Sequence, residues 1–458
     1  MPSTVTGKLF AGREFVDRVA RQSPARLAVT TFAGVIAFFT LLLEAPWATA
    51  SGRSAPFVDA LFTATSAVCV TGLVVVPTGE YWSTWGLVVI LIGIKVGGLG
   101  VMTLASILGL AVSRRIGLTQ KLLTAEETKT TRLGEVGSLI RTIVITSTSL
   151  EVIVALFLFP RFWALGESPG RAAWHGIFYG ISAFNNAGFV PTPQGLVPYV
   201  GDWLLCVPLV IGVFMGSLGF PVILNIMRHR RRASKWSLHT KLTLTMSSAL
   251  LGLGSVAFAA MEWSNPKTFG PLSLGAKLNA SLFAGMMPRS CGFSTVDTGQ
   301  MREGSWLITD ALMFVGGGSA STSGGIKVTT LAVMLLAILA EARGDRDVEA
   351  FGRRIPRETL RLAVAVVFVG ATIVLVASLA LLEITGRTLD TVLFEVISAF
   401  ATVGLSTGIT PLLPAVAKYI LIALMFVGRT GTMTFAAALA LRDRRRVVRF
   451  PEERPIIG

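Results

Sequence analysis

The side chains that usually carry bond chemistry are few and scattered in this chain. Its three cysteines, at positions 69, 206 and 291, lie in apolar surroundings and show neither metal-ligand spacing nor a disulfide pattern. The three histidines are isolated and fit surface or interfacial positions better than a ligand set. No nucleophile, acid–base pair, metal site or nucleotide motif is visible, so we expect neither an enzyme nor a bound cofactor.

The residues that do recur at regular spacing belong to four short motifs that end in glycine. The motifs are Val70-Thr71-Gly72, Asn186-Ala187-Gly188, Ser290-Cys291-Gly292 and Thr402-Val403-Gly404. Their glycines follow one another at intervals of 116, 104 and 112 residues. A phenylalanine lies nine or ten residues before each glycine. A serine lies six residues before the glycine in the first, second and fourth copies, and Met286 takes that place in the third. Four copies in register indicate an internal repeat.

Backbone carbonyls, rather than side chains, could do the chemistry of these motifs. Each motif ends a half-hydrophobic stretch of about a dozen residues, which is too short for a helix to cross a bilayer. Such a stretch at membrane depth needs protein or water around it, and a re-entrant half-helix with an extended tail meets that need. Four tails around one axis would form a ring of carbonyl oxygens that replaces the hydration shell of a monovalent cation, and Thr402-Val403-Gly404 matches the start of a potassium-channel filter.

The elements that must position the motifs are apolar helices. Of the 458 residues, 52% are hydrophobic and 15% are charged, and the mean hydropathy is +0.68. Uncharged runs such as Trp203–Met227, Leu242–Met261 and Leu362–Leu382 are long enough to span a membrane. Five basic segments hold 29 of the 41 lysines and arginines, which predicts that these segments and both termini are cytoplasmic. The net charge of +15 therefore indicates membrane topology and no nucleic-acid partner.

These features predict an all-α integral membrane protein with four helix–re-entrant P-loop–helix repeats, and hence eight spanning helices, around one pseudo-fourfold pore. The predicted segments are a cytoplasmic N-terminal tail (1–26), repeat 1 (27–113), a cytoplasmic loop (114–136), repeats 2 to 4 (137–228, 241–341 and 361–442) and a cytoplasmic C-terminal tail (443–458). The basic N-terminus and the apolar run Leu27–Leu43 also fit a secretory signal, but the run is long for one and the first repeat needs this helix.

The third repeat carries a break within its second helix. Residues 316–325 are all glycine, serine, alanine or threonine, and they include Gly316, Gly317, Gly318, Ser319, Gly324 and Gly325. Each glycine costs a helix about 1 kcal/mol relative to alanine, so the segment predicts an intramembrane loop, with a helix-packing face as the alternative. Lys327 and Arg429 lie in or near second helices, where a cation normally faces protein or water, although Lys327 could also reach the cytoplasmic surface.

On these motifs the chain resembles the Trk/Ktr/HKT superfamily of potassium transporters, and most of all the membrane subunit of bacterial Ktr uptake systems. The resemblance implies that the twelve motif residues form a potassium-selective filter, that loop 316–325 gates the pathway below it, and that Arg429 holds the closed state. It also implies potassium uptake down the electrochemical gradient across a bacterial inner membrane, with possible sodium dependence. Plant relatives with a serine in place of Gly72 favour sodium, so this glycine points to potassium.

The resemblance implies partners as well: a homodimer, membrane lipids, and a cytosolic nucleotide-binding regulatory ring that docks on the basic loops. The basic cluster Arg228–Arg232 most simply meets anionic lipid headgroups. Two alternatives stay open. A sodium-permeable cation channel is one, because selectivity depends on filter geometry. A secondary cation symporter is the other, although such folds usually show inverted or twofold repeats.

Overall fold

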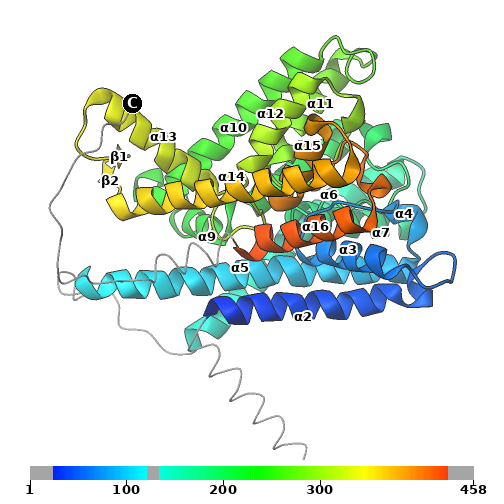
Figure 1. Cartoon of the computed structure of the whole chain (residues 1–458), viewed down its shortest axis with the longest axis horizontal. Coiled ribbons are helices and arrows are strands. Elements are labelled where there is room, and N and C mark those ends of the chain that lie inside the picture. The colour runs from blue at the N-terminus through cyan, green and yellow to red at the C-terminus, as the bar shows by residue number, and fades with distance from the viewer. Residues whose placement is uncertain (1–23, 121–133, 231, 432–458) are drawn as a thin grey trace, which may run out of the picture.

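The computed structural model describes residues 24–120, 134–230 and 232–431, and within them the chain is mostly helical (Figure 1). The predicted C-terminal tail, nearly all of the N-terminal tail and most of the loop predicted at 114–136 lie outside the described residues. The prediction of an all-α fold is confirmed with one small exception. A two-stranded hairpin, β1 (Glu349–Ala350) and β2 (Arg353–Arg354), connects the third repeat to the fourth.

Grouped by the predicted repeats, the helices depart from two predicted boundaries, because α5 continues past 113 and α6 begins before 137. The first repeat contains α2 (Pro24–Glu44), η1 (Pro46–Ala48), α3 (Phe57–Val68), α4 (Thr78–Tyr81) and α5 (Thr84–Gln120). The second contains α6 (Gly134–Ala164), α7 (Pro169–Phe184), η2 (Val197–Tyr199), α8 (Trp203–Leu218) and α9 (Phe220–His229), and η3 (Ala233–Lys235) follows it. The third contains α10 (Leu238–Glu262), α11 (Leu274–Met286), η4 (Met287–Arg289), η5 (Thr298–Gln300), α12 (Glu303–Phe314) and α13 (Val328–Arg343). The fourth contains α14 (Arg357–Thr385), α15 (Leu389–Phe400), η6 (Thr410–Leu412), α16 (Ala415–Phe426) and η7 (Val427–Gly431).

Four helices of the described chain are long and apolar enough to cross a membrane. They are Thr84–Leu104 within α5, Ile140–Ala164 within α6, α10 and α14, and the bent pair α8 and α9 would make a fifth. The short helices α3, α7, α11 and α15 have 12, 16, 13 and 12 residues, which is too few to cross. The helices that follow them in the second, third and fourth repeats, α8, α12 and α16, have only 16, 12 and 12 residues, so eight spans stay a prediction.

The structure corrects the expectation of one continuous span over Trp203–Met227. Helices α8 and α9 meet at Gly219 with a bend of 98°. Gly219 has a φ of +91°, and a Cβ atom there would lie 2.5 Å from the carbonyl oxygen of Ser319, which belongs to the glycine-rich loop. Pro221 then occupies the first turn of α9, where its missing N–H has no cost. A packed loop and two special residues therefore break an apolar run that carries no charge.

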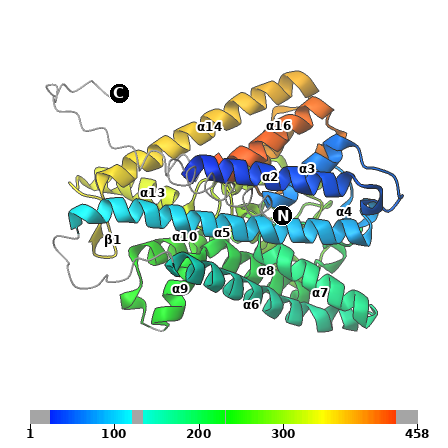
Figure 2. The ribbon, with the colours of Figure 1, turned by 90° about the horizontal axis from the view of Figure 1, so that it is seen from below.

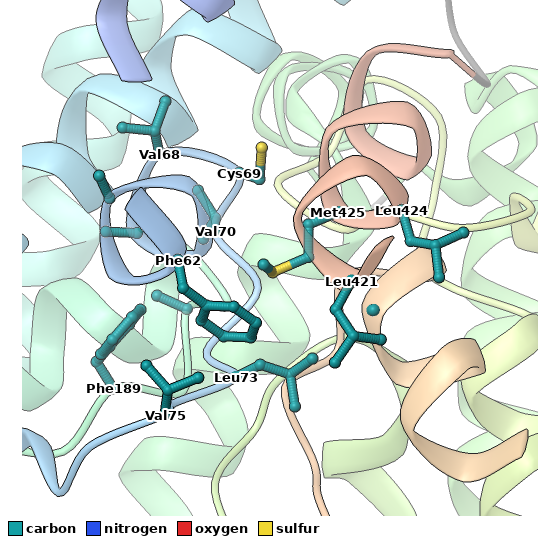
Figure 3. Close-up of a cluster of buried hydrophobic side chains, with 14 of the residues drawn as sticks. Phe62, Val68, Cys69, Val70, Leu73, Val75, Phe189, Leu421, Leu424 and Met425 are labelled. Carbon is teal, nitrogen blue, oxygen red and sulfur yellow. The ribbon is translucent and has the colours of Figure 1, made fainter. Parts of the chain in front are cut away.

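The first and fourth repeats pack against each other, so the described chain closes on itself. Figure 3 shows Phe62 of α3 near Leu421 and Met425 of α16, and all three belong to one buried apolar cluster. Lys418 of α16 also forms an ion pair with Asp59 of α3 at 3.0 Å. Helices α2 and α5 of the first repeat run side by side in both overall views (Figures 1 and 2).

An ion pair between a partly buried lysine and a buried glutamate joins the first repeat to the second. Lys95 Nζ of α5 lies 2.6 Å from the Glu151 carboxylate of α6 and also donates to the hydroxyls of Ser147 and Thr148. The side-chain amide of Asn185, at the end of α7, donates to the same carboxylate at 2.8 Å. These contacts identify the partners of Glu151, which interrupts an otherwise apolar helix.

We expect Glu151→Leu alone to lower the free energy of unfolding by about 1.5–3 kcal/mol, because the partly buried Lys95 ammonium and the buried amide of Asn185 lose their acceptor. The double variant Lys95→Met/Glu151→Leu removes both charges and should recover most of that loss. Thermal unfolding of the purified protein in detergent measures both. A double variant no more stable than Glu151→Leu would show that the pair is not what holds these helices together.

Candidate functional site

Each glycine motif follows the end of a short helix, at a sharp turn of the backbone. We call α3, α7, α11 and α15 the pore helices. The first motif residue has a φ of 54° in Val70, 60° in Asn186 and 49° in Thr402, and of 132° in Ser290. Residues other than glycine rarely adopt such angles, and backbone of this kind clusters at functional sites, where surrounding contacts hold it in place. Three motifs share one conformation, and the third differs.

The four motif glycines form a closed ring. A Cβ atom on Gly72 would lie 2.2 Å from a carbonyl oxygen of the second motif, and one on Gly188 would lie 2.3 Å from the amide nitrogen of Gly292. A Cβ on Gly292 would lie 2.8 Å from the carbonyl of Gly404, and one on Gly404 would lie 2.2 Å from a carbonyl oxygen of the first motif. Each motif thus contacts the next in chain order, and only glycine allows so close an approach.

A serine six residues before the glycine supports three of the motifs. Ser66 Oγ and Ser398 Oγ each accept a hydrogen bond from the amide of their own motif glycine, at 3.0 and 3.1 Å. Ser182 Oγ and Ser398 Oγ each donate to the carbonyl that follows the motif glycine, at 2.9 and 2.6 Å. Met286 takes this place in the third motif and can make neither bond, which agrees with the different φ of Ser290.

We expect Ser398→Ala to lower the free energy of unfolding by about 1–3 kcal/mol, because the buried amide of Gly404 and the carbonyl of Leu405 lose their partner. The matched control is Ser378→Ala, since Ser378 is also buried but its hydroxyl has no hydrogen-bond partner in the described chain. The shift of the thermal unfolding midpoint in detergent compares the two. Equal shifts of the midpoint in the two variants would show that Ser398 does not stabilise the motif.

Three further glycines, which the repeat alone did not single out, let the second helices reach the pore helices. Cβ atoms on Gly97, Gly216 and Gly428 would lie 2.0, 1.8 and 1.7 Å from the carbonyl oxygen of the residue four places before the motif glycine. They follow their motif glycines by 25, 28 and 24 residues. This recurrence is visible in the sequence and could have indicated the contact.

The glycine-rich loop lies directly against the ring. The chain between α12 and α13 is described throughout and forms no helix, as the loop interpretation predicts. The amide of Gly324 donates to Ser290 Oγ at 3.3 Å, and a Cβ on Gly324 would lie 2.0 Å from Thr402 Oγ1. The side-chain amide of Asn186 lies 3.2 Å from Ser323 Oγ. The loop therefore contacts the first residue of three of the four motifs.

Two basic side chains and the bent second helix hold this loop. The buried Arg429 of η7 donates from Nη1 to the carbonyl oxygen of Thr322. Lys327 Nζ donates to the carbonyl of Ser323 at 2.6 Å, at the end of the loop. The amide of Gly318 donates to the carbonyl of Ser217 in α8 at 2.7 Å. The structure thus brings together the predicted loop residues, Lys327 and Arg429, and their gating role stays a prediction.

The ring offers neutral oxygen atoms. The motifs contain no carboxylate, and Thr71 Oγ1 and Thr402 Oγ1 are buried without a hydrogen-bond partner in the described chain. Backbone carbonyls arranged in this way can replace the water around a monovalent cation. The pore helices end at the motifs, so the partial negative charge of their carboxyl ends lies next to the ring and favours a cation there.

The chain is similar to known cation transport proteins. The family model described as "Cation transport protein", TrkH, matches residues 14–445. The chain is 38% identical to the Ktr system potassium uptake protein B of Bacillus subtilis, over 97% of this chain and 99% of that protein. It is 34% identical to the potassium/sodium uptake protein NtpJ of Enterococcus hirae, over 96% and 98%. The crystal structure of the potassium transporter TrkH from Vibrio parahaemolyticus superposes with a TM-score of 0.71 at 16% identity, over 91% of this chain and 84% of that one.

Proposed function

The chain belongs to the TrkH family of cation transport proteins, and from this premise we propose that it is the membrane subunit of a potassium uptake system. The observation that carries the proposal is the closed ring of motif glycines, in which each would clash with the next if it had a side chain. A ring of carbonyls can select a monovalent cation without any bond chemistry. The relatives named as potassium uptake proteins match nearly the whole chain, which supports the same assignment.

The proposed pathway has a filter and a gate. The filter consists of the twelve motif residues, and their backbone carbonyls are the main ligands. The gate is the loop 316–325, because it lies against the first residues of three motifs and would obstruct an ion that leaves the filter. Lys327 and Arg429 hold the loop, and their positive charges repel a cation from the same place. Movement of this loop would open the pathway to passive uptake, down the electrochemical gradient, across a bacterial inner membrane.

The proposed assembly is a homodimer in the lipid membrane with a cytosolic regulatory ring that binds nucleotides. The name of the Bacillus subtilis relative, which calls it part of a Ktr system, supports a separate subunit. The basic connections between repeats would form its docking surface. Purification of the tagged membrane subunit from its native membranes, followed by identification of co-purifying proteins, tests this. Recovery of a homodimer without any cytosolic partner would argue against the ring.

The proposed function is tested by growth. A bacterial strain without its own potassium uptake systems should grow on limiting potassium when it carries this chain together with a matched regulatory subunit. The control is the same strain with the regulatory subunit alone. Failure of the well-expressed chain to support growth would count against potassium as the transported ion.

A sodium-permeable pathway is the second candidate, and one comparison favours it: the Enterococcus hirae relative is named a potassium/sodium uptake protein. Uptake of each ion into cells with the other present or absent separates the candidates. Uptake of potassium that saturates and requires sodium would instead indicate a coupled symporter. Potassium uptake that is independent of sodium supports the proposal above.

A further inference from the structure

The residue three places before each motif glycine lies at the junction of the pore helix and the filter. These residues are Cys69, Asn185, Arg289 and Ala401, and all four side chains are fully buried. Arg289 is the charged member of the four. The guanidinium of arginine stays protonated in proteins. The residue directly before the third motif therefore carries a permanent positive charge, and none of its three counterparts does.

Nothing in the described chain neutralises this charge. Arg289 Nη1 donates to the carbonyl of Ser247 in α10 at 2.8 Å, Nη2 donates to Ser247 Oγ at 2.9 Å, and Nε has no partner. No carboxylate in the described residues forms an ion pair with it. The corresponding place in the second repeat differs, because Asn185 contacts Glu151, whose charge is already balanced by Lys95.

The position of Arg289 also matters for the helix end on which it lies. It is the last residue of η4, which continues the pore helix α11. A cation at the carboxyl end of a helix offsets the partial negative charge there. The pore helices α3, α7 and α15 thus present a partial negative charge to the ring, whereas Arg289 offsets that charge at the end of α11. In the third motif, the first residue Ser290 has a φ of 132°, unlike the 49–60° of the other three, and its hydroxyl accepts a hydrogen bond from the loop amide of Gly324.

We propose that Arg289 is a specificity-determining residue: a fixed positive charge behind the third motif that selects against divalent cations. The inference rests on the proposed function, because it requires the ring to be the ion pathway. The electrostatic energy of an ion in the field of a fixed charge is proportional to the charge of the ion, so it is twice as large for a divalent ion as for potassium at the same place. The factor by which it lowers divalent occupancy is therefore the square of the factor for potassium. The guanidinium is bound to Ser247 of α10, so Arg289 acts on the ions through its electrostatic field and not as a plug.

The test measures how strongly Ba²⁺, which has nearly the radius of K⁺, inhibits potassium flux. The full-length protein is reconstituted in vesicles of phosphatidylethanolamine and phosphatidylglycerol, and flux is followed at increasing Ba²⁺ concentration. Arg289→Gln should lower the half-inhibitory Ba²⁺ concentration by about tenfold, whereas Arg289→Lys, which keeps the charge, should change it by less than about threefold.

A second pair of variants leaves Arg289 in place. Ser247→Asp adds a carboxylate beside the guanidinium and should increase Ba²⁺ sensitivity like Arg289→Gln. Ser247→Asn introduces a side chain of the same shape as aspartate but without the charge, and it should not. Unchanged Ba²⁺ sensitivity in folded Arg289→Gln or Ser247→Asp would overturn the inference. Loss of the folded protein in all four variants would also overturn it, because Arg289 would then have a purely structural role. A parent protein without potassium flux would instead refute the proposed function, so the two failures are distinguishable.

Discussion

Replacement of Gly72 by serine is expected to abolish the preference of the chain for potassium over sodium. Gly72 has a φ of +93°, and its Cβ would lie 2.2 Å from the carbonyl oxygen of Ala187, so this carbonyl must move out of the ring. Strain of this kind costs on the order of 1–3 kcal/mol, and each 1.4 kcal/mol or so is a factor of ten. We therefore expect the ratio of potassium to sodium uptake to fall roughly tenfold or more in cells that depend on this chain.

Gly408→Ser is the matched control for this variant. Gly408 has a φ of +94°, nearly that of Gly72, but a Cβ there meets nothing within 4 Å. It therefore carries the same backbone strain without displacing a carbonyl, and it should keep the ion preference. If both variants lost the preference equally, strain alone would explain the effect. If Gly72→Ser kept it, the ring would not be the filter.

The fourfold repeat and its motifs could be predicted from the sequence because the ring demands particular residues at particular places. Glycine recurs where a side chain would strike the neighbouring motif, and serine recurs where the motif amide and the following carbonyl need a partner. A ring built from backbone groups needs glycine and serine at fixed places in each repeat, and this requirement leaves a regular pattern in a single sequence. The loop 316–325 was visible for the same reason, since so many glycines exclude a stable helix.

Contacts between distant segments could not be predicted in this way. The bend at Gly219 depends on the loop around Ser319, which lies about 100 residues further along the chain and leaves no periodic signal. The partner of Glu151 comes from another repeat. Glu395, buried in pore helix α15, is satisfied by the backbone amide of Thr407 and by hydroxyls that follow the fourth motif. Hydrophobic pattern shows that such polar groups are costly, but it does not show which residues satisfy them.

The second large effect is expected from Arg429→Gln, which should raise potassium flux through the protein when no regulatory partner is present. The Nη1 bond from Arg429 to the carbonyl of Thr322 ties the loop to the fourth repeat. A hydrogen bond from a charged donor contributes roughly 1.5–3 kcal/mol, so its loss should shift the gate toward the open state by roughly ten- to hundredfold. Tracer uptake into vesicles that contain only the purified chain measures this basal flux.

Two controls separate the bond from the charge and from the helix. Arg429→Lys keeps a positive charge below the ring but lacks the fork of the guanidinium, so it should raise flux nearly as much as Arg429→Gln if the bond holds the gate. If repulsion of the ion is what matters, Arg429→Lys should stay closed. Lys418→Met removes a charge in the first turn of α16, the helix that leads into η7, where Lys418 pairs with Asp59, and it should leave basal flux low. A leak of equal size in Lys418→Met and Arg429→Gln would mean that loosening α16 opens the pathway, and that the loop is not held by Arg429 in particular.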